Sequence, residues 1–268
     1  MQSNTLRIYR ASLRSQFRET IRYRPSLFFN IANTALFTLV MLLYIPFYSS
    51  SVQAAVGTHN VLSYVLLGAI FAMFTEMMWQ TRYILQDELD YGIIDYTFSS
   101  PMSRFGYFFA LSMAAGTLEM IFNLPIFAIA VLAAISVVHA AGMILSLVSI
   151  CLTLVITLFI GECLGAAVLV YRRIGGITGL IATASNFLSG AFVPLAIFPS
   201  TVQYIAFMFP QTAGLYLARY YLSGSALIIP VYAAWLIMIG EMLFFGFLAW
   251  LILRFAESVA KVEGFQHV

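Results

Sequence analysis

The sequence has 268 residues, of which 62% are hydrophobic and 9% are charged. A soluble domain is about half apolar and about a quarter charged, so this composition indicates an integral membrane protein and excludes an ordinary soluble one. The formal net charge of +2 is too small to suggest nucleic acid as a partner.

Residues 6–24 are predicted to form an amphipathic helix at the membrane surface. Arginines recur there every three or four positions, which places them in one stripe of a helix. A second stripe, about 100° away by helical geometry, is apolar. A helix in the headgroup layer can bury such a stripe and extend its arginines to lipid phosphates; a solvated basic tail is the alternative. The basic stripe consists of Arg7, Arg10, Arg14, Arg18 and Arg22, and the apolar one of Tyr9, Leu13, Phe17 and Ile21.

Six apolar stretches follow, each judged against the about twenty residues that a membrane-spanning helix needs. All Lys and Arg residues except Arg219 then fall on the side of the N-terminus. Because basic residues concentrate on the cytoplasmic side, both termini are predicted to be cytoplasmic, with residues 255–268 as a tail. The predicted spans are 27–48, 61–82, two within 105–171 that are separated near 136–142, 174–193, and 230–254.

The stretch 194–229 is too apolar for a free loop and too often interrupted by proline for a span. We predict two short re-entrant helices in it, near 200–209 and 211–222, on the extracellular side. Pro210 is expected at the corner between them.

Residues 83–104 join the second and third predicted spans and contain four acidic residues within nine positions. Hydrocarbon does not tolerate such a cluster, so this segment is expected in water at the membrane face. Gly92 offers a bend. A structured polar segment of this kind suits the docking of a soluble partner, and an ordinary cytoplasmic loop is the alternative. The acidic residues are Asp87, Glu88, Asp90 and Asp95.

Two separated stretches of the sequence form motifs. The first contains Asp90-Tyr91-Gly92-Ile93-Ile94-Asp95 and then Phe98-Ser99-Ser100-Pro101-Met102-Ser103-Arg104. The second contains Ser189-Gly190-Ala191-Phe192-Val193-Pro194-Leu195, then Phe198-Pro199, then Phe209-Pro210-Gln211-Thr212, and ends at Arg219. In this order and topology they resemble the ATP-binding-cassette (ABC) type-2 transporter permeases. Ile93-Ile94-Asp95 departs from the Thr-Leu-Glu that the family often has, and Phe209 stands in place of its Asn.

The resemblance implies an all-α permease of the cell membrane, formed by a single domain over 1–268. Two such subunits, identical or related, would sit on two copies of a separate ABC ATPase. They would export a hydrophobic or amphipathic substrate of the drug, lipid or glycolipid class, driven by ATP hydrolysis. The resemblance also implies that residues 83–104 hold a coupling helix that fits the ATPase, and that the N-terminal helix makes a second contact with it.

These implications assign site residues. The coupling residues are Asp87, Glu88, Asp90, Gly92, Asp95, Pro101 and Arg104. The substrate path is expected at Asn186, Ser189 and Phe192, in and after a run of small residues that favours close helix contact. The interface helix contributes Arg10, Arg14, Arg18 and Arg22.

The chain is not expected to be an enzyme or to bind a cofactor itself. A phosphate-binding loop needs Gly-x-x-x-x-Gly-Lys-Ser/Thr, and the single lysine, Lys261, lies outside such a context. ATP and Mg²⁺ would therefore be bound by the partner ATPase. The cysteines and histidines of the sequence form no metal-ligand cluster, so no metal site is predicted.

Four glutamates in or near the predicted spans support an alternative function. Intramembrane carboxylates are costly and usually face an interior or a cavity, so they could form the relay of an ion-coupled transporter or channel. Structural pairing is the other interpretation. The sequence leaves the roles of these residues open. They are Glu76, Glu119, Glu162 and Glu241.

Overall fold

The structure is a computed structural model of the whole chain. It describes residues 2–43, 45–47, 50–58, 60–99, 103–135, 139–171, 175–226 and 228–263. All regular secondary structure within these ranges is helical, which confirms the all-α class.

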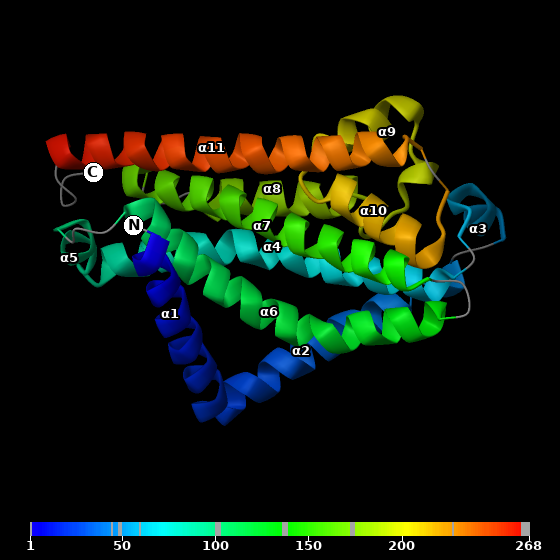
Figure 1. The fold of residues 1–268 in the computed structure, drawn as a ribbon, viewed down its shortest axis with the longest axis horizontal. Coiled ribbons are helices and arrows are strands. Elements are labelled where there is room, and N and C mark those ends of the chain that lie inside the picture. The colour runs from blue at the N-terminus through cyan, green and yellow to red at the C-terminus, as the bar shows by residue number, and fades with distance from the viewer. Residues whose placement is uncertain are drawn as a thin grey trace.

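Four long helices form the body of the bundle (Figure 1). They are α4 (Val61–Asp90), α6 (Arg104–Ala134), α7 (Ala140–Tyr171) and α11 (Val231–Glu263). Each is long and apolar enough to cross a membrane, as expected of a multi-pass membrane protein. α7 packs along both α4 and α11 and is the central helix of the bundle.

Side-chain caps fix the start of two of these helices. Asn60 precedes α4 and its Oδ1 accepts a hydrogen bond of 3.1 Å from the Ser63 N–H. Ser103 precedes α6 and its Oγ accepts one of 3.3 Å from the Gly106 N–H. Each cap satisfies a backbone donor that the first turn of a helix leaves unpaired.

The first two helices, α1 (Gln2–Arg22) and α2 (Arg24–Leu42), form a V beside the bundle, with a bend of 91° between them (Figure 1). α1 crosses α6, where the Tyr9 hydroxyl lies 3.0 Å from the Thr117 hydroxyl. Ser12 is buried, whereas Phe17 and Ile21 of the predicted apolar stripe are exposed. α1 therefore contacts α6 through Tyr9 and buries Ser12, whereas the later part of its apolar stripe is uncovered within the subunit. Its place at the membrane surface stays a prediction.

The six predicted spans are represented unevenly. Besides the four long helices, α1 and α2 count as a fifth span only if the bent pair is taken as one. α8 (Gly175–Leu188) has 14 residues and is shorter than a full span. It ends five residues before the predicted boundary because the chain turns at Gly190, whose φ is +85°. The count of six spans stays a prediction.

Short helices gather at one end of the bundle (Figure 1). The pair α9 (Ser200–Ala206) and α10 (Thr212–Ser223) lies close to the two ranges expected between the last spans, with Pro210 between them. α10 is almost entirely buried and packs on α7 and α4. The other short helices at this end are η1 (Ile45–Phe47), α3 (Ser50–Val56) and η2 (Leu195–Ile197). The opposite end holds α5 (Ile94–Ser99), the start of α1 and the end of α11.

Candidate functional site

The acidic segment forms a helix end followed by a short helix, which we call the α5 corner (residues 87–99). α4 continues eight residues past its predicted end near Arg82 and stops at Asp90. Gly92 then makes the turn into α5 with a φ of +65°, a conformation that favours glycine. Asp87, Glu88 and Asp90 therefore project from the last turn of a long helix, where sequence analysis expected a separate segment.

Glu88 is used inside the subunit. Its Oε2 accepts a hydrogen bond of 2.9 Å from the Thr97 hydroxyl, and its Oε1 accepts one of 2.9 Å from the Tyr107 hydroxyl. Only 9% of the residue is exposed. The carboxylate thus ties together α4, α5 and α6, and it does not present itself to a partner as the coupling assignment expected.

The α5 corner rests on packed side chains. Ile94 of α5 is buried in a cluster with Leu85 of α4, Phe108 of α6 and Leu253 of α11. Arg104 forms an ion pair of 2.7 Å with Glu257 of α11. This predicted coupling residue therefore joins α6 to α11. The corner is firmly attached to three long helices.

The outer face of the α5 corner is acidic and aromatic. Asp87 and Asp90 are exposed, and Asp90 Oδ1 accepts a hydrogen bond of 3.1 Å from the Gln86 amide. Tyr91 and Tyr96 are 76% and 81% exposed. Exposed tyrosines beside carboxylates suit a protein partner. Among the other predicted coupling residues, the side chain of Asp95 and all of Pro101 lie outside the described part of the chain.

We predict that Glu88→Ala lowers the free energy of unfolding by about 2–3 kcal/mol, because two buried hydrogen bonds to a charged acceptor are lost. Urea unfolding of the purified protein in detergent micelles, followed by far-UV circular dichroism, measures this change. In a double-mutant cycle, the effects of Glu88→Ala and Tyr107→Phe on the free energy of unfolding should be strongly non-additive. Asp90→Ala is the exposed control and should leave the midpoint unchanged. Equal unfolding midpoints for Glu88→Ala and Asp90→Ala would show that the hydrogen bonds of Glu88 do not stabilise the protein.

At the other end of the bundle, Arg219 of α10 joins three separate segments, and we call this contact the Arg219 junction. Its Nε donates to the carbonyl of Tyr64 at 3.1 Å, its Nη1 to that of Gly190 at 2.7 Å, and its Nη2 to that of Ala191 at 3.5 Å. The guanidinium also lies 3.6 Å from the centre of the Tyr64 ring. Arg219 is 4% exposed, so a buried cation holds α4, the Gly190 turn and α10 together.

The Arg219 junction connects the two halves of the second sequence motif. In the sequence, Arg219 is the last motif residue and the one basic residue on its side, and neither observation predicts its role. A lone cation in an apolar stretch was the available signal, because such a charge must find buried acceptors.

The three predicted substrate-path residues have different surroundings. Asn186 is half-buried and donates a hydrogen bond of 3.1 Å to the Thr75 hydroxyl of α4. Ser189 is buried and lines a cavity of about 260 Å³ beside the Arg219 junction. Phe192 packs against the rings of Phe37 and Phe187. Their role in a substrate path stays a prediction.

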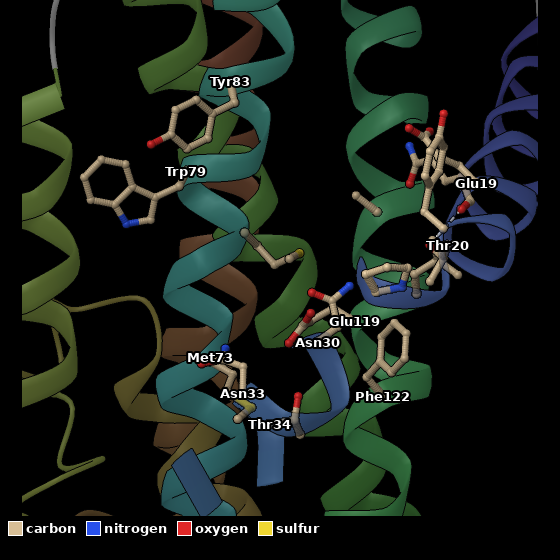
Figure 2. Close-up of a pocket in the computed structure, with 16 residues that line it drawn as sticks. Glu19, Thr20, Asn30, Asn33, Thr34, Met73, Trp79, Tyr83, Glu119 and Phe122 are labelled. Carbon is tan, nitrogen blue, oxygen red and sulfur yellow. Dashed lines mark hydrogen bonds between the residues drawn. The ribbon is translucent and has the colours of Figure 1, made fainter. Parts of the chain in front are cut away.

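A larger cavity of about 880 Å³ lies between α1, α2, α4 and α6 (Figure 2). We call it the α1/α2/α4/α6 cavity. Its polar lining includes Thr20 of α1, Asn30, Asn33 and Thr34 of α2, and Glu119 of α6. Glu119 was noticeable in the sequence as a glutamate in an apolar stretch, but the cavity was not, because four helices build it.

The family model for the ABC-2 type transporter matches residues 7–223. This match includes the α5 corner, the α1/α2/α4/α6 cavity and the Arg219 junction. The chain belongs to the ABC-2 type transporter family. It is therefore a membrane permease subunit of an ABC transporter, and members of this family are transport permeases rather than enzymes. No match to this permease is found among curated proteins.

The intramembrane glutamates of this ABC-2 permease are held differently. Asn123 donates a hydrogen bond of 3.0 Å to Glu119 Oε1, and Ser112 donates one of 3.2 Å to the buried Glu162. Both carboxylate oxygens of Glu241 are buried without a hydrogen-bond partner among the described residues. The side chain of Glu76 lies outside the described part of the structure. Burial and hydrogen bonding of Glu162 within the subunit favour a structural role for this residue, whereas Glu119 also lines the α1/α2/α4/α6 cavity.

Proposed function

We propose that this ABC-2 permease exports a hydrophobic or amphipathic substrate across the cell membrane, driven by ATP hydrolysis on a separate ATPase subunit. Two permease subunits, identical or related, would act together on two ATPase subunits. The observation that carries this proposal is the α5 corner, which exposes Asp87, Asp90, Tyr91 and Tyr96 on a rigid base. In the proposed orientation in the membrane, which follows the distribution of basic residues, the α5 corner and both termini face the cytoplasm.

The physical case for docking at the α5 corner has two parts. Tyrosines supply large contact areas at a small cost in side-chain entropy, and they are common anchors of protein interfaces. The carboxylates of Asp87 and Asp90 add charge that can steer and orient a basic groove on the partner. Because the two hydrogen bonds of Glu88 and the buried Ile94 fix the corner to the bundle, a force applied there would move the long helices.

We expect the double variant Asp87→Lys/Asp90→Lys to lose co-purification with the ATPase by at least about tenfold, which corresponds to ~1.4 kcal/mol. Tyr96→Ala should weaken it as well. The measurement is affinity purification of the tagged permease from its native membrane, with the ATPase identified by mass spectrometry and quantified. Tyr204→Ala is the matched control, because Tyr204 is also an exposed tyrosine, at 64%, but lies on α9 at the opposite end of the bundle.

Two results would contradict this docking site. One is undiminished ATPase co-purification and ATP-dependent transport by the double variant. The other is labelling of a Tyr96→Cys protein, in which Cys151 and Cys163 are replaced by serine, by a membrane-impermeant maleimide applied to the outside of intact cells. Such labelling would place the α5 corner on the wrong side of the membrane.

A further inference from the structure

The α1/α2/α4/α6 cavity has a lining of one charge sign. Two carboxylates, from Glu19 and Glu119, contribute to it, and no Lys, Arg or His does so among the described residues that line it. The nearby cation Arg82 lies over the rings of Trp79 and Tyr83, at 5.6 and 4.8 Å from their centres. These rings form the far side of the cavity, beyond α4 from Glu119 (Figure 2). A cationic ligand would therefore bind most favourably on the side of the cavity that holds Glu119, away from Arg82.

The carboxylate of Glu119 is placed deep in the bundle. It lies fifteen residues from the start of α6 at Arg104, about 22 Å along the helix axis. Asn123, which is buried, donates through its Nδ2 to both the backbone carbonyl and the Oε1 of Glu119, each at 3.0 Å. Asn123 is thus a positioning residue for this carboxylate. A carboxylate so far along an apolar helix is costly unless it faces a cavity or a partner charge.

The α2 wall adds neutral polar groups at the same place. Asn30 and Asn33 are exposed on α2 and line the cavity together with Thr34. Asn30 lies beside Glu119, whereas Asn33 lies near Met73 of α4 (Figure 2). Exposed amides on a membrane helix are unfavourable against lipid, so they indicate a water-filled or ligand-binding space.

The remainder of the wall is apolar and adaptable. Met73 and Met77 of α4 and Leu118 and Phe122 of α6 line it. Methionine side chains are flexible and polarizable, so they can pack against ligands of different shape. The volume of about 880 Å³ is within the range of small-molecule sites.

We propose that the α1/α2/α4/α6 cavity binds a lipophilic organic cation, with the cationic group beside Glu119 and the apolar body against Met73, Met77 and Phe122. This inference deepens the proposed function, on which it rests, because it assigns a substrate class and a binding site to the permease. Glu19, which is exposed on α1 and also lines the cavity, adds a second, weaker attraction for the cation.

The test uses two ions of nearly the same shape and opposite charge, tetraphenylphosphonium and tetraphenylborate. Binding of each radiolabelled ion to the purified full-length permease in detergent micelles is measured by equilibrium dialysis, with empty micelles as the blank. We expect saturable binding of tetraphenylphosphonium and a Kd that rises at least about tenfold in Glu119→Gln. Glu241→Gln is the matched control, because Glu241 is a carboxylate of α11 that does not line the cavity, and its Kd should equal that of the wild type.

A second variant keeps the test decisive if Glu119→Gln fails to fold, as judged by circular dichroism and gel filtration. Glu19 is exposed, so Glu19→Lys should fold, and it is expected to weaken tetraphenylphosphonium binding at least about threefold. Equal binding by the wild type and the folded cavity variants would overturn the proposal. So would tetraphenylborate binding as tight as that of tetraphenylphosphonium, because it would show that the charge of the ligand does not determine binding.

Failure of this test is distinguishable from failure of the proposed function. The binding assay contains no ATPase, whereas the α5 corner is tested by ATPase co-purification. Intact ATPase docking without cation binding would overturn the cavity assignment alone, and cation binding without ATPase docking would overturn the coupling role of the corner alone.

Discussion

Arg219→Met is expected to lower the free energy of unfolding by at least about 3 kcal/mol. The variant keeps an unbranched side chain but removes the donors to the carbonyls of Tyr64, Gly190 and Ala191. A buried acceptor that loses its partner costs about 1–3 kcal/mol, and three are affected together. Urea unfolding in detergent micelles, followed by far-UV circular dichroism, measures the change. Protease cleavage within the Gly190 turn should also become faster, because that turn is held by Arg219.

Arg254→Met is the matched control for this change. The guanidinium of Arg254 also lies over an aromatic ring, 4.3 Å from the centre of that of Trp250. Arg254 is exposed on α11, however, so its replacement should leave the unfolding midpoint almost unchanged. If both variants unfolded at the wild-type midpoint, the Arg219 junction would not be a source of stability.

Gly68→Ala is expected to disrupt the same junction from the α4 side. A Cβ at this position would lie 2.5 Å from the carbonyl oxygen of Ala191 and 2.7 Å from Nη2 of Arg219. One of these contacts is with backbone, so the Gly190 turn must shift away from α4. We expect a loss of about 1–3 kcal/mol in the free energy of unfolding, the usual cost of overpacking a core.

The control for Gly68→Ala is Gly240→Ala. Gly240 lies within α11, and a Cβ there would meet nothing within 4 Å. Alanine is the better helix former by about 1 kcal/mol, so this variant should be as stable as the wild type or more stable. The same urea titration compares the two. A Gly68→Ala protein as stable as Gly240→Ala would show that α4 and the Gly190 turn can separate without cost.

Sequence patterns predicted the elements better than their ends. Prolines at 194, 199 and 210 located α9 and α10 to within a few residues, because proline restricts where a helix can run. The end of α4 was placed near Arg82 because hydropathy falls there. Residues 83–90 still favour a helix, and the chain has no breaker before Gly92.

Contacts between distant segments were beyond the reach of sequence patterns. Glu88 and Asp87 are neighbours in the acidic cluster, yet Glu88 turns inward because its partner Tyr107 belongs to the next long helix. Tyr64 lies 155 positions from Arg219, and four helices contribute to the α1/α2/α4/α6 cavity. In the sequence, the Arg219 junction and the cavity are indicated only by an unusual residue type, a lone arginine in one case and a glutamate in an apolar stretch in the other.

The length of α4 has a mechanical consequence. The same helix supplies Tyr64 to the Arg219 junction and Glu88 to the α5 corner, twenty-four residues and about 36 Å apart along its axis. Between Gly68 and Asp90 it contains neither glycine nor proline, so this stretch has no sequence-encoded hinge. If the α5 corner docks the ATPase as proposed, we expect this stretch of α4 to act as a stiff lever that carries a push at the corner toward the Arg219 junction.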